Sequence, residues 1–212
     1  MRDATPKAAP ILQLAGVTYC LPDRVLFENR SLDIPAGLTL VRGGEGSGKT
    51  RTLLLLAGLS PPVEGTLTLK GVSLSTAHAA YCRQVFRVDP RADTHDAIPV
   101  GHFFSSLEVL YPNFSPTDLA DLVAGFSLQA QLDKCLYMLS TGTRRKVLLA
   151  AALASGAALT LLDEPFAALD RPSVMFLHAV LTDAAHHPHR AFVIADHEAP
   201  EGIPLAACID LA

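Results

Sequence analysis

Apolar and polar positions along the chain fall into two patterns, and their order predicts a mixed α/β fold. Residues 11–19 (ILQLAGVTY) and 30–37 (RSLDIPAG) alternate apolar and polar positions, which is typical of strands with one buried face. Three other segments are apolar almost throughout and predict buried strands: residues 38–43 (LTLVRG), 157–162 (AALTLL) and 191–196 (AFVIAD). Buried strands of this kind are usual in parallel sheets with helices on both faces.

The remaining segments complete an alternation of strands and helices. Helices are predicted from Lys49 to near Gly58, from Ser140 onward and after Pro172, and short helices within residues 93–138, which hold several prolines and aromatics. Further strands are predicted at residues 64–74, 83–89 and 207–211. Because strands alternate with helices, the sequence predicts a mainly parallel sheet.

The composition is that of a folded domain with a sizeable core. The chain has 212 residues, of which 50% are hydrophobic, and a formal net charge of −4. Its isoelectric point of about 6.0 argues against a general nucleic-acid binder, which would be basic. Residues 1–9 contain no apolar run of signal-peptide length and are expected to be a flexible cytosolic tail. The longest apolar run, residues 147–162, is shorter than the roughly 20 residues of a membrane helix, so no membrane span is predicted.

Neither the cysteines nor the histidines have the spacing of a disulfide framework or a zinc site. The four cysteines lie far apart without a C-x-x-C pair, which favours separate thiols in a reducing compartment: Cys20, Cys82, Cys135 and Cys208. The sequence HHPH at residues 186–189 is an alternative metal site. Because Pro188 breaks any shared helical face, a solvated loop between a helix and a strand is favoured there.

Residues 43–50 (GGEGSGKT) match the phosphate-loop pattern G-x-x-x-x-G-K-[ST], between a predicted strand and a predicted helix. Glycines let backbone N–H groups curl around a phosphate at the helix N-terminus. Lys49 would reach the β- and γ-phosphates, and Thr50 would offer its hydroxyl to Mg²⁺. An accidental match has a chance on the order of one in a hundred in a chain of this length. The candidate nucleotide-binding residues are Gly43, Gly44, Glu45, Gly46, Ser47, Gly48, Lys49, Thr50 and Arg51.

Two adjacent carboxylates end the apolar strand in the segment 159–165 (LTLLDEP). Alternation along a strand points Asp163 and Glu164 in different directions. Asp163 can hold Mg²⁺ through water, while Glu164 faces the γ-phosphate and polarises an attacking water. The alternative is a pair of surface acids at a strand end, which the nearby phosphate loop makes less favoured.

At five segments, in the same order, the chain resembles the ATP-binding cassette (ABC) ATPases. The segments are VTYCLPDRVLF (17–27), GKTRTLLLLAGL (48–59), LSTGTRRKVLLAAAL (139–153), LLDEPFAALD (161–170) and VIADHE (193–198). The resemblance implies a P-loop NTPase (RecA-like) α/β core with an N-terminal antiparallel β subdomain and a small helical subdomain. It also implies ATP and Mg²⁺ as cofactors.

The resemblance assigns roles to further residues. His197 would contact the γ-phosphate, and Tyr19 would stack on adenine, although a lone strand tyrosine is often core packing. The signature residues Ser140, Thr141 and Gly142 would face ATP bound to a second cassette. The cations that follow them, at 144–146, would then have that γ-phosphate nearby.

The chain also departs from the family pattern. The signature has Thr141 and Thr143 where Gly and Gln are usual, and Arg51 replaces a usual hydroxyl residue. The family glutamine that links Mg²⁺ to the helical subdomain is not evident. Asp89 is nearest to its place and is a candidate Mg²⁺ contact, with Arg87 as an alternative.

A single cassette without a membrane segment resembles the separate ATPase subunit of a transporter. The resemblance implies an ATP-hydrolysing domain over residues 10–212, with a helical subdomain at about 90–142 whose most apolar part is 101–114. Partners would be a membrane-spanning permease and a second cassette, identical or different, with no nucleic acid. The protein would lie in the cytoplasm, peripheral on the inner face of the membrane. Alternatives are a degenerate cassette with little turnover, a soluble non-transport ABC ATPase and a P-loop kinase of small metabolites.

Overall fold

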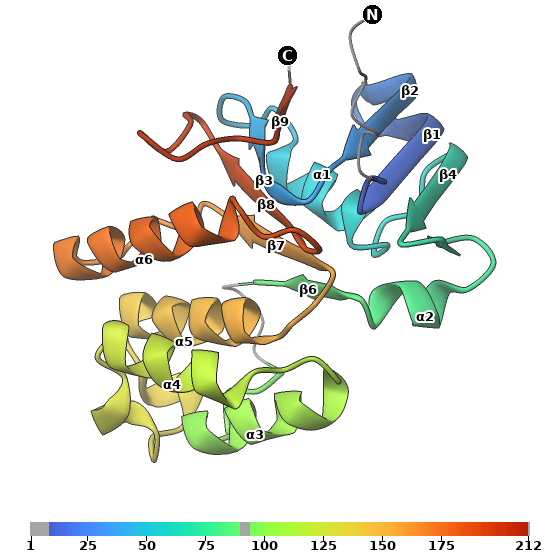
Figure 1. Cartoon of the computed structure of the whole chain (residues 1–212). Helices are drawn as coiled ribbons and strands as arrows, with labels where there is room; N and C mark the ends of the chain where they lie inside the picture. The colour runs from blue at the N-terminus through green and yellow to red at the C-terminus, as the bar shows by residue number, and fades with distance from the viewer. Residues whose placement is uncertain (1–8, 90–93, 212) are drawn as a thin grey trace, which may run out of the picture.

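The chain forms two sheets that pack around helix α1. The computed structural model describes residues 9–89 and 94–211, so the predicted tail lies almost wholly outside the described residues. One sheet has four strands in the order β2-β1-β4-β5, and the other has five in the order β6-β7-β8-β3-β9. Figure 1 shows α1 between the sheets and α5 and α6 beyond the five-stranded sheet.

The four-stranded sheet is antiparallel and near the N-terminus, as predicted. Its strands are β1 (Leu12–Cys20), β2 (Val25–Ile34), β4 (Glu64–Leu69) and β5 (Val72–Ser73). β2 begins five residues before the predicted start at residue 30, because the antiparallel pairing with β1 continues to Cys20 and Val25. One face of the sheet packs on α1.

The five-stranded sheet is parallel throughout. Its strands are β3 (Gly37–Arg42), β6 (Val85–Arg87), β7 (Leu159–Asp163), β8 (Ala191–Asp196) and β9 (Ala207–Asp210). Arg42 pairs with Asp196, and Asp163 pairs with Ala195, so three strands end together at one edge. In parallel sheets this carboxyl edge is where ligands bind. The predicted α/β fold class is confirmed.

Two cores cover the two faces of this sheet, because side chains alternate along its strands. Leu38 and Leu40 of β3 belong to the core under α5 and α6. Val41 belongs to the core shared with α1 and the antiparallel sheet. The helices are α1 (Lys49–Leu56), α2 (His78–Cys82), α3 (Val100–Leu110), α4 (Pro116–Gly125), α5 (Thr141–Ala154) and α6 (Arg171–Ala184).

Two helix ends have clear local causes. Ser140 caps α5, because its Oγ accepts a hydrogen bond from Thr143 N at 3.2 Å, as the sequence predicts. α6 begins at Arg171, two residues before the predicted start, since Asp170 caps it and Pro172 is well tolerated in a first turn.

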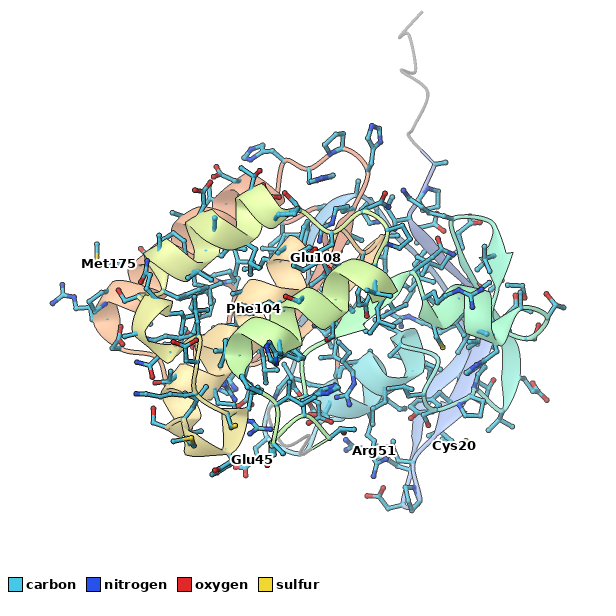
Figure 2. All side chains as sticks on the ribbon, turned by 90° about the horizontal axis from the view of Figure 1, so that it is seen from below. Cys20, Glu45, Arg51, Phe104, Glu108 and Met175 are labelled. Carbon is cyan, nitrogen blue, oxygen red and sulfur yellow. The ribbon has the colours of Figure 1, made fainter. Side chains whose placement is uncertain are left out.

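The aromatic residues of segment 101–114 belong mainly to the core. Phe103 and Phe104 are buried, and Tyr111 and Phe114 are partly buried against the same cluster. Figure 2 looks onto α3, where Phe104 and the exposed Glu108 are labelled. These aromatic side chains therefore pack in the core under the helices rather than forming an apolar surface. Among the described residues, no helix is both long and apolar enough to cross a membrane.

Candidate functional site

The phosphate loop, residues 43–50, connects β3 to α1 at the carboxyl edge of the parallel sheet. Gly46 and Gly48 have backbone φ angles of 71° and 103°, a region that favours glycine. A Cβ at Gly48 would also lie 2.9 Å from a methyl group of Leu26. By contrast, a Cβ at Gly44 or Gly46 would meet nothing within 4 Å, so the outer side of the loop is open. The backbone N–H groups at the start of α1 have no side-chain cap, which suits an anion.

Lys49 stabilises this loop through hydrogen bonds to its backbone. Only 7% of the residue is exposed, and Nζ donates to the carbonyl oxygens of Gly43 and Gly44 at 2.8 Å each. An ammonium group has three donors, so two of them hold the loop and one is left for a phosphate oxygen. The positive charge therefore lies at the place where the sequence predicts phosphate.

A cavity of about 380 Å³, here called the phosphate cavity, opens over the loop. Glu164 and residues 45–51 line one side of it, and Leu21, Pro22 and Asp23 line the other. The labelled side chains of Glu45 and Arg51 lie at the same margin of the molecule in Figure 2.

A hydrogen bond from an arginine joins two of the segments that line the phosphate cavity. Arg24, in the turn between β1 and β2, donates from Nη2 to Gly46 O at 2.7 Å. The turn that holds Leu21 and Pro22 is thereby fixed beside the phosphate loop.

Tyr19 does not line this cavity, which corrects the prediction that it stacks on adenine. Its side chain is packed in the core, with 3% of the residue exposed, and its hydroxyl donates to Ser60 Oγ at 2.8 Å. Tyr19 lies on the same buried face of β1 as Val17, so strand alternation was the signal for its position. The chain leaves the strand at Cys20, and Leu21 then faces the cavity.

Leu21→Tyr is expected to tighten ATP binding about fivefold to tenfold, because it would add an aromatic surface where the base leaves the phosphate loop. Base stacking on an aromatic ring contributes about 1–3 kcal/mol. Calorimetry with ATP measures the change, and inorganic tripolyphosphate, which has no base, is the matched control ligand. A gain for both ligands, or for neither, would contradict the placement of the base against Leu21.

A second cavity of about 330 Å³, here called the carboxylate cavity, lies beside the first. Its lining residues are Thr50, Leu54, Arg87, Asp89, Arg145, Asp163 and Glu164. Thr50 Oγ1 donates to Asp163 Oδ2 at 2.6 Å, although the two residues are far apart in sequence. A hydroxyl and a carboxylate oxygen are hard donors of the kind that Mg²⁺ prefers, so this pair fits the predicted ion.

Asp89 reaches the same cavity from the end of β6. Its Oδ2 accepts from Arg87 Nη2 at 2.6 Å, so the two candidates for the place of the missing glutamine form one ion pair. Gln84, by contrast, precedes β6 and donates to Ala80 O. The position of Asp89 beside Thr50 and Asp163 is compatible with a contact to Mg²⁺, which stays a prediction.

Glu164 lines both cavities, and an unusual backbone conformation places it there. β7 ends at Asp163, and Glu164 follows with a φ of 45°, in the left-handed region. Because Glu164 lies beyond the end of β7, its placement relative to Asp163 depends on this left-handed backbone conformation and not on the strand alternation that the sequence predicts. Glu164 N donates to Ala195 O at 2.9 Å, which ties the reversal to β8.

His197 lies at the rim of the site. It follows the end of β8, its side chain is 67% exposed, and its Nε2 is 3.6 Å from Asp196 Oδ1. It is not among the residues that line either cavity. Its predicted contact with the γ-phosphate stays a prediction.

The signature residues Ser140, Thr141 and Gly142 also line neither cavity. Ser140 and Thr141 are exposed at the N-terminus of α5. A Cβ on Gly142 would lie 2.6 Å from Ala168 O, so glycine is needed for the close approach to the loop after β7. Within one chain, the signature and the phosphate loop are therefore separate surfaces.

The three cations after the signature have partners inside the chain. Arg144 pairs with Asp96, and Lys146 pairs with Asp170. Arg145 donates to a backbone carbonyl, that of Glu164. The prediction that a γ-phosphate supplies their anion is therefore wrong for Arg144 and Lys146, whose charges are met by carboxylates. Arg145 was not singled out from the sequence, because the contact joins segments that no motif links.

Comparison with known proteins agrees with these features. The family model described as "ABC transporter" matches residues 27–167. The cytochrome c biogenesis ATP-binding export protein CcmA of Pseudomonas syringae pv. tomato is 32% identical over 207 residues, which cover 97% of each chain. The CcmA protein of Idiomarina loihiensis is 31% identical over 170 residues, covering 80% of this chain and 78% of that protein.

Solved structures show the same fold. An ATP-binding subunit of an ABC transporter superposes with a TM-score of 0.78 at 19% identity, covering 88% of this chain and 79% of that one. The dimeric, post-hydrolysis state of the ATP-binding cassette MJ0796 bound to ADP and Pi gives a TM-score of 0.71 at 19% identity, covering 88% of each chain.

Proposed function

The chain belongs to the ATP-binding cassette family of ABC transporter subunits, and from that premise we propose that it powers an exporter that serves cytochrome c biogenesis. Family membership makes it an ATPase that uses ATP with Mg²⁺ and works with a membrane permease and a second cassette. The export process is proposed from the names of the relatives, two of which cover most of this chain. The observation that carries the cassette function is the phosphate cavity, where the loop, Lys49 and Glu164 meet.

The chain's own residues divide the work of ATP hydrolysis between the two cavities. The phosphate loop and Lys49 would bind the β- and γ-phosphates, and Thr50 and Asp163 would hold Mg²⁺, with Asp89 nearby. When bound, Mg²⁺ neutralises charge on the phosphates.

Glu164 would accept a proton from water as the water oxygen bonds to the γ-phosphorus and the bond from that phosphorus to the ADP oxygen breaks. Its place between the two cavities supports this role. His197, at the rim, would contact the γ-phosphate once ATP and a second cassette close the site.

The second cassette would supply the signature. Ser140 and Thr141 are exposed and separate from the chain's own phosphate cavity, so they are free to face ATP on a partner cassette. Backbone N–H groups at the start of α5 and its helix dipole would attract the γ-phosphate even with threonines at 141 and 143. The protein would be peripheral on the cytoplasmic face of the membrane, held there by the permease.

The proposed process predicts a specific loss in cells. Deletion of the gene should lower mature c-type cytochrome, the wild-type chain should restore it, and Glu164→Gln should not, because export needs turnover. The tagged wild-type chain should also copurify with a membrane protein from solubilised membranes. Normal cytochrome c levels after deletion would reject this process while leaving the ATPase assignment intact.

A further inference from the structure

Arg145, on the signature helix α5, reaches across to the residue that would act as the catalytic base. Its Nη1 donates to Glu164 O at 2.5 Å, and Arg145 also lines the carboxylate cavity. The residue is half-buried, and its Nε is buried and makes no hydrogen bond within the described residues. An arginine held in this way is a rigid, charged donor aimed at one backbone oxygen.

The contact falls on a peptide group in an unusual conformation. Glu164 has a φ of 45°, which side chains other than glycine rarely adopt unless their surroundings hold them there. Its N–H donates to Ala195 O at 2.9 Å, and its carbonyl accepts from Ala167 N at 3.1 Å as well as from Arg145. Hydrogen bonds therefore fix the backbone on both sides of the Glu164 Cα.

We propose that Arg145 is a positioning residue for Glu164. By holding the carbonyl, it keeps the reversed backbone from relaxing, so the carboxylate stays between the two cavities. This inference rests on the proposed role of Glu164 as the base. Arg145 itself would not contact ATP, because it lines only the carboxylate cavity.

The position of Arg145 in α5 gives the contact a second consequence. The same helix begins with the exposed residues Ser140 and Thr141, which would face ATP on the partner cassette. A shift of α5 on engaging that ATP would move Arg145 and, through the carbonyl, Glu164. One helix would then connect the signature of one site to the base of the other.

Arg145→Met tests the proposal, because methionine keeps an unbranched stem and removes the donor. The kcat for ATP hydrolysis should fall at least about tenfold, while the Kd for ATP and the Tm stay close to wild type. Arg145→Lys, which retains a cation with a shorter reach, should recover part of the kcat. Arg144→Met removes an equal charge one residue earlier, where the partner is Asp96, and should lower kcat much less.

Three outcomes would overturn the proposal. A wild-type kcat in Arg145→Met would show that the carbonyl contact does not matter. A raised Kd with kcat preserved would make Arg145 an ATP contact, and a low Tm with kcat restored on cooling would make it only structural. If Arg145→Met does not fold, the kcat, the Kd for ATP and the Tm are measured for Arg145→Gln instead.

A double variant separates this proposal from the assignment of the base. In the Glu164→Gln background, Arg145→Met should cause no further loss of kcat, because both act through one group. An additional tenfold loss there would mean that Arg145 acts independently. Full activity of Glu164→Gln alone would reject the proposed base instead.

Discussion

Glu164→Gln is expected to lower ATP turnover at least about a hundredfold and to leave the affinity for ATP unchanged. General base catalysis contributes about 10²–10⁴-fold, and an amide cannot accept the proton of water as a carboxylate does. Glutamine has nearly the same shape, and the backbone hydrogen bonds that hold residue 164 do not involve its side chain. The loss should therefore appear in kcat, measured by phosphate release, and not in the Kd measured by calorimetry.

The same variant should accumulate as an ATP-bound dimer, since the two cassettes that enclose ATP separate only after hydrolysis. Light scattering with and without ATP measures this pairing. Thr141→Asp in the Glu164→Gln background should prevent it by adding a negative charge where the partner's γ-phosphate would lie. Thr141→Asn is the uncharged control of similar size. Thr141 is preferable to Gly142 for this test, because a Cβ at Gly142 would lie 2.6 Å from Ala168 O.

Three results would contradict this account. Normal turnover in Glu164→Gln would show that another group takes the proton. If Thr141→Asp and Thr141→Asn form the ATP-bound dimer to the same extent, the segment LSTGT does not face the partner's ATP and only caps its helix. A wild-type rate no higher than that of Glu164→Gln, in the presence of the permease, would instead identify a degenerate cassette.

Lys49→Ala is expected to weaken ATP binding about tenfold to a hundredfold. A hydrogen bond to a charged group contributes about 1.5–3 kcal/mol, and Lys49 is the buried cation of the phosphate loop. The variant also loses the two bonds from Nζ to Gly43 O and Gly44 O, so the loop should become less well ordered. Calorimetry with ATP, together with thermal unfolding, separates the two effects.

Arg51→Ala is the control for Lys49→Ala. Arg51 also lines the phosphate cavity, but it is exposed, and an exposed charge contributes no more than about 1 kcal/mol. Its loss should change the Kd less than tenfold. An unchanged Kd in Lys49→Ala would reject residues 43–50 as a phosphate-binding loop.

Local patterns in the sequence were sufficient for the elements and for much of the site. The apolar segment 191–196 became β8 with the predicted bounds, because a strand covered on both faces needs apolar side chains along its length, and the polar Asp196 comes only at its end. The phosphate loop could be identified because its chemistry is carried by consecutive residues, with glycines where φ is positive. Ser140 as a helix cap likewise depends only on its neighbours within α5.

Contacts between distant segments were decided only by the tertiary structure. Leu21 lies in the wall of the phosphate cavity because a hydrogen bond from Arg24 Nη2 to Gly46 O holds the turn after β1 beside the phosphate loop. The backbone reversal at Glu164 depends on hydrogen bonds from β8 and from Arg145. Such bonds depend on how sheets and helices pack against each other. Packing produces no regular spacing of residues along the sequence, so the contact of Arg145 with Glu164 could not have been predicted from it.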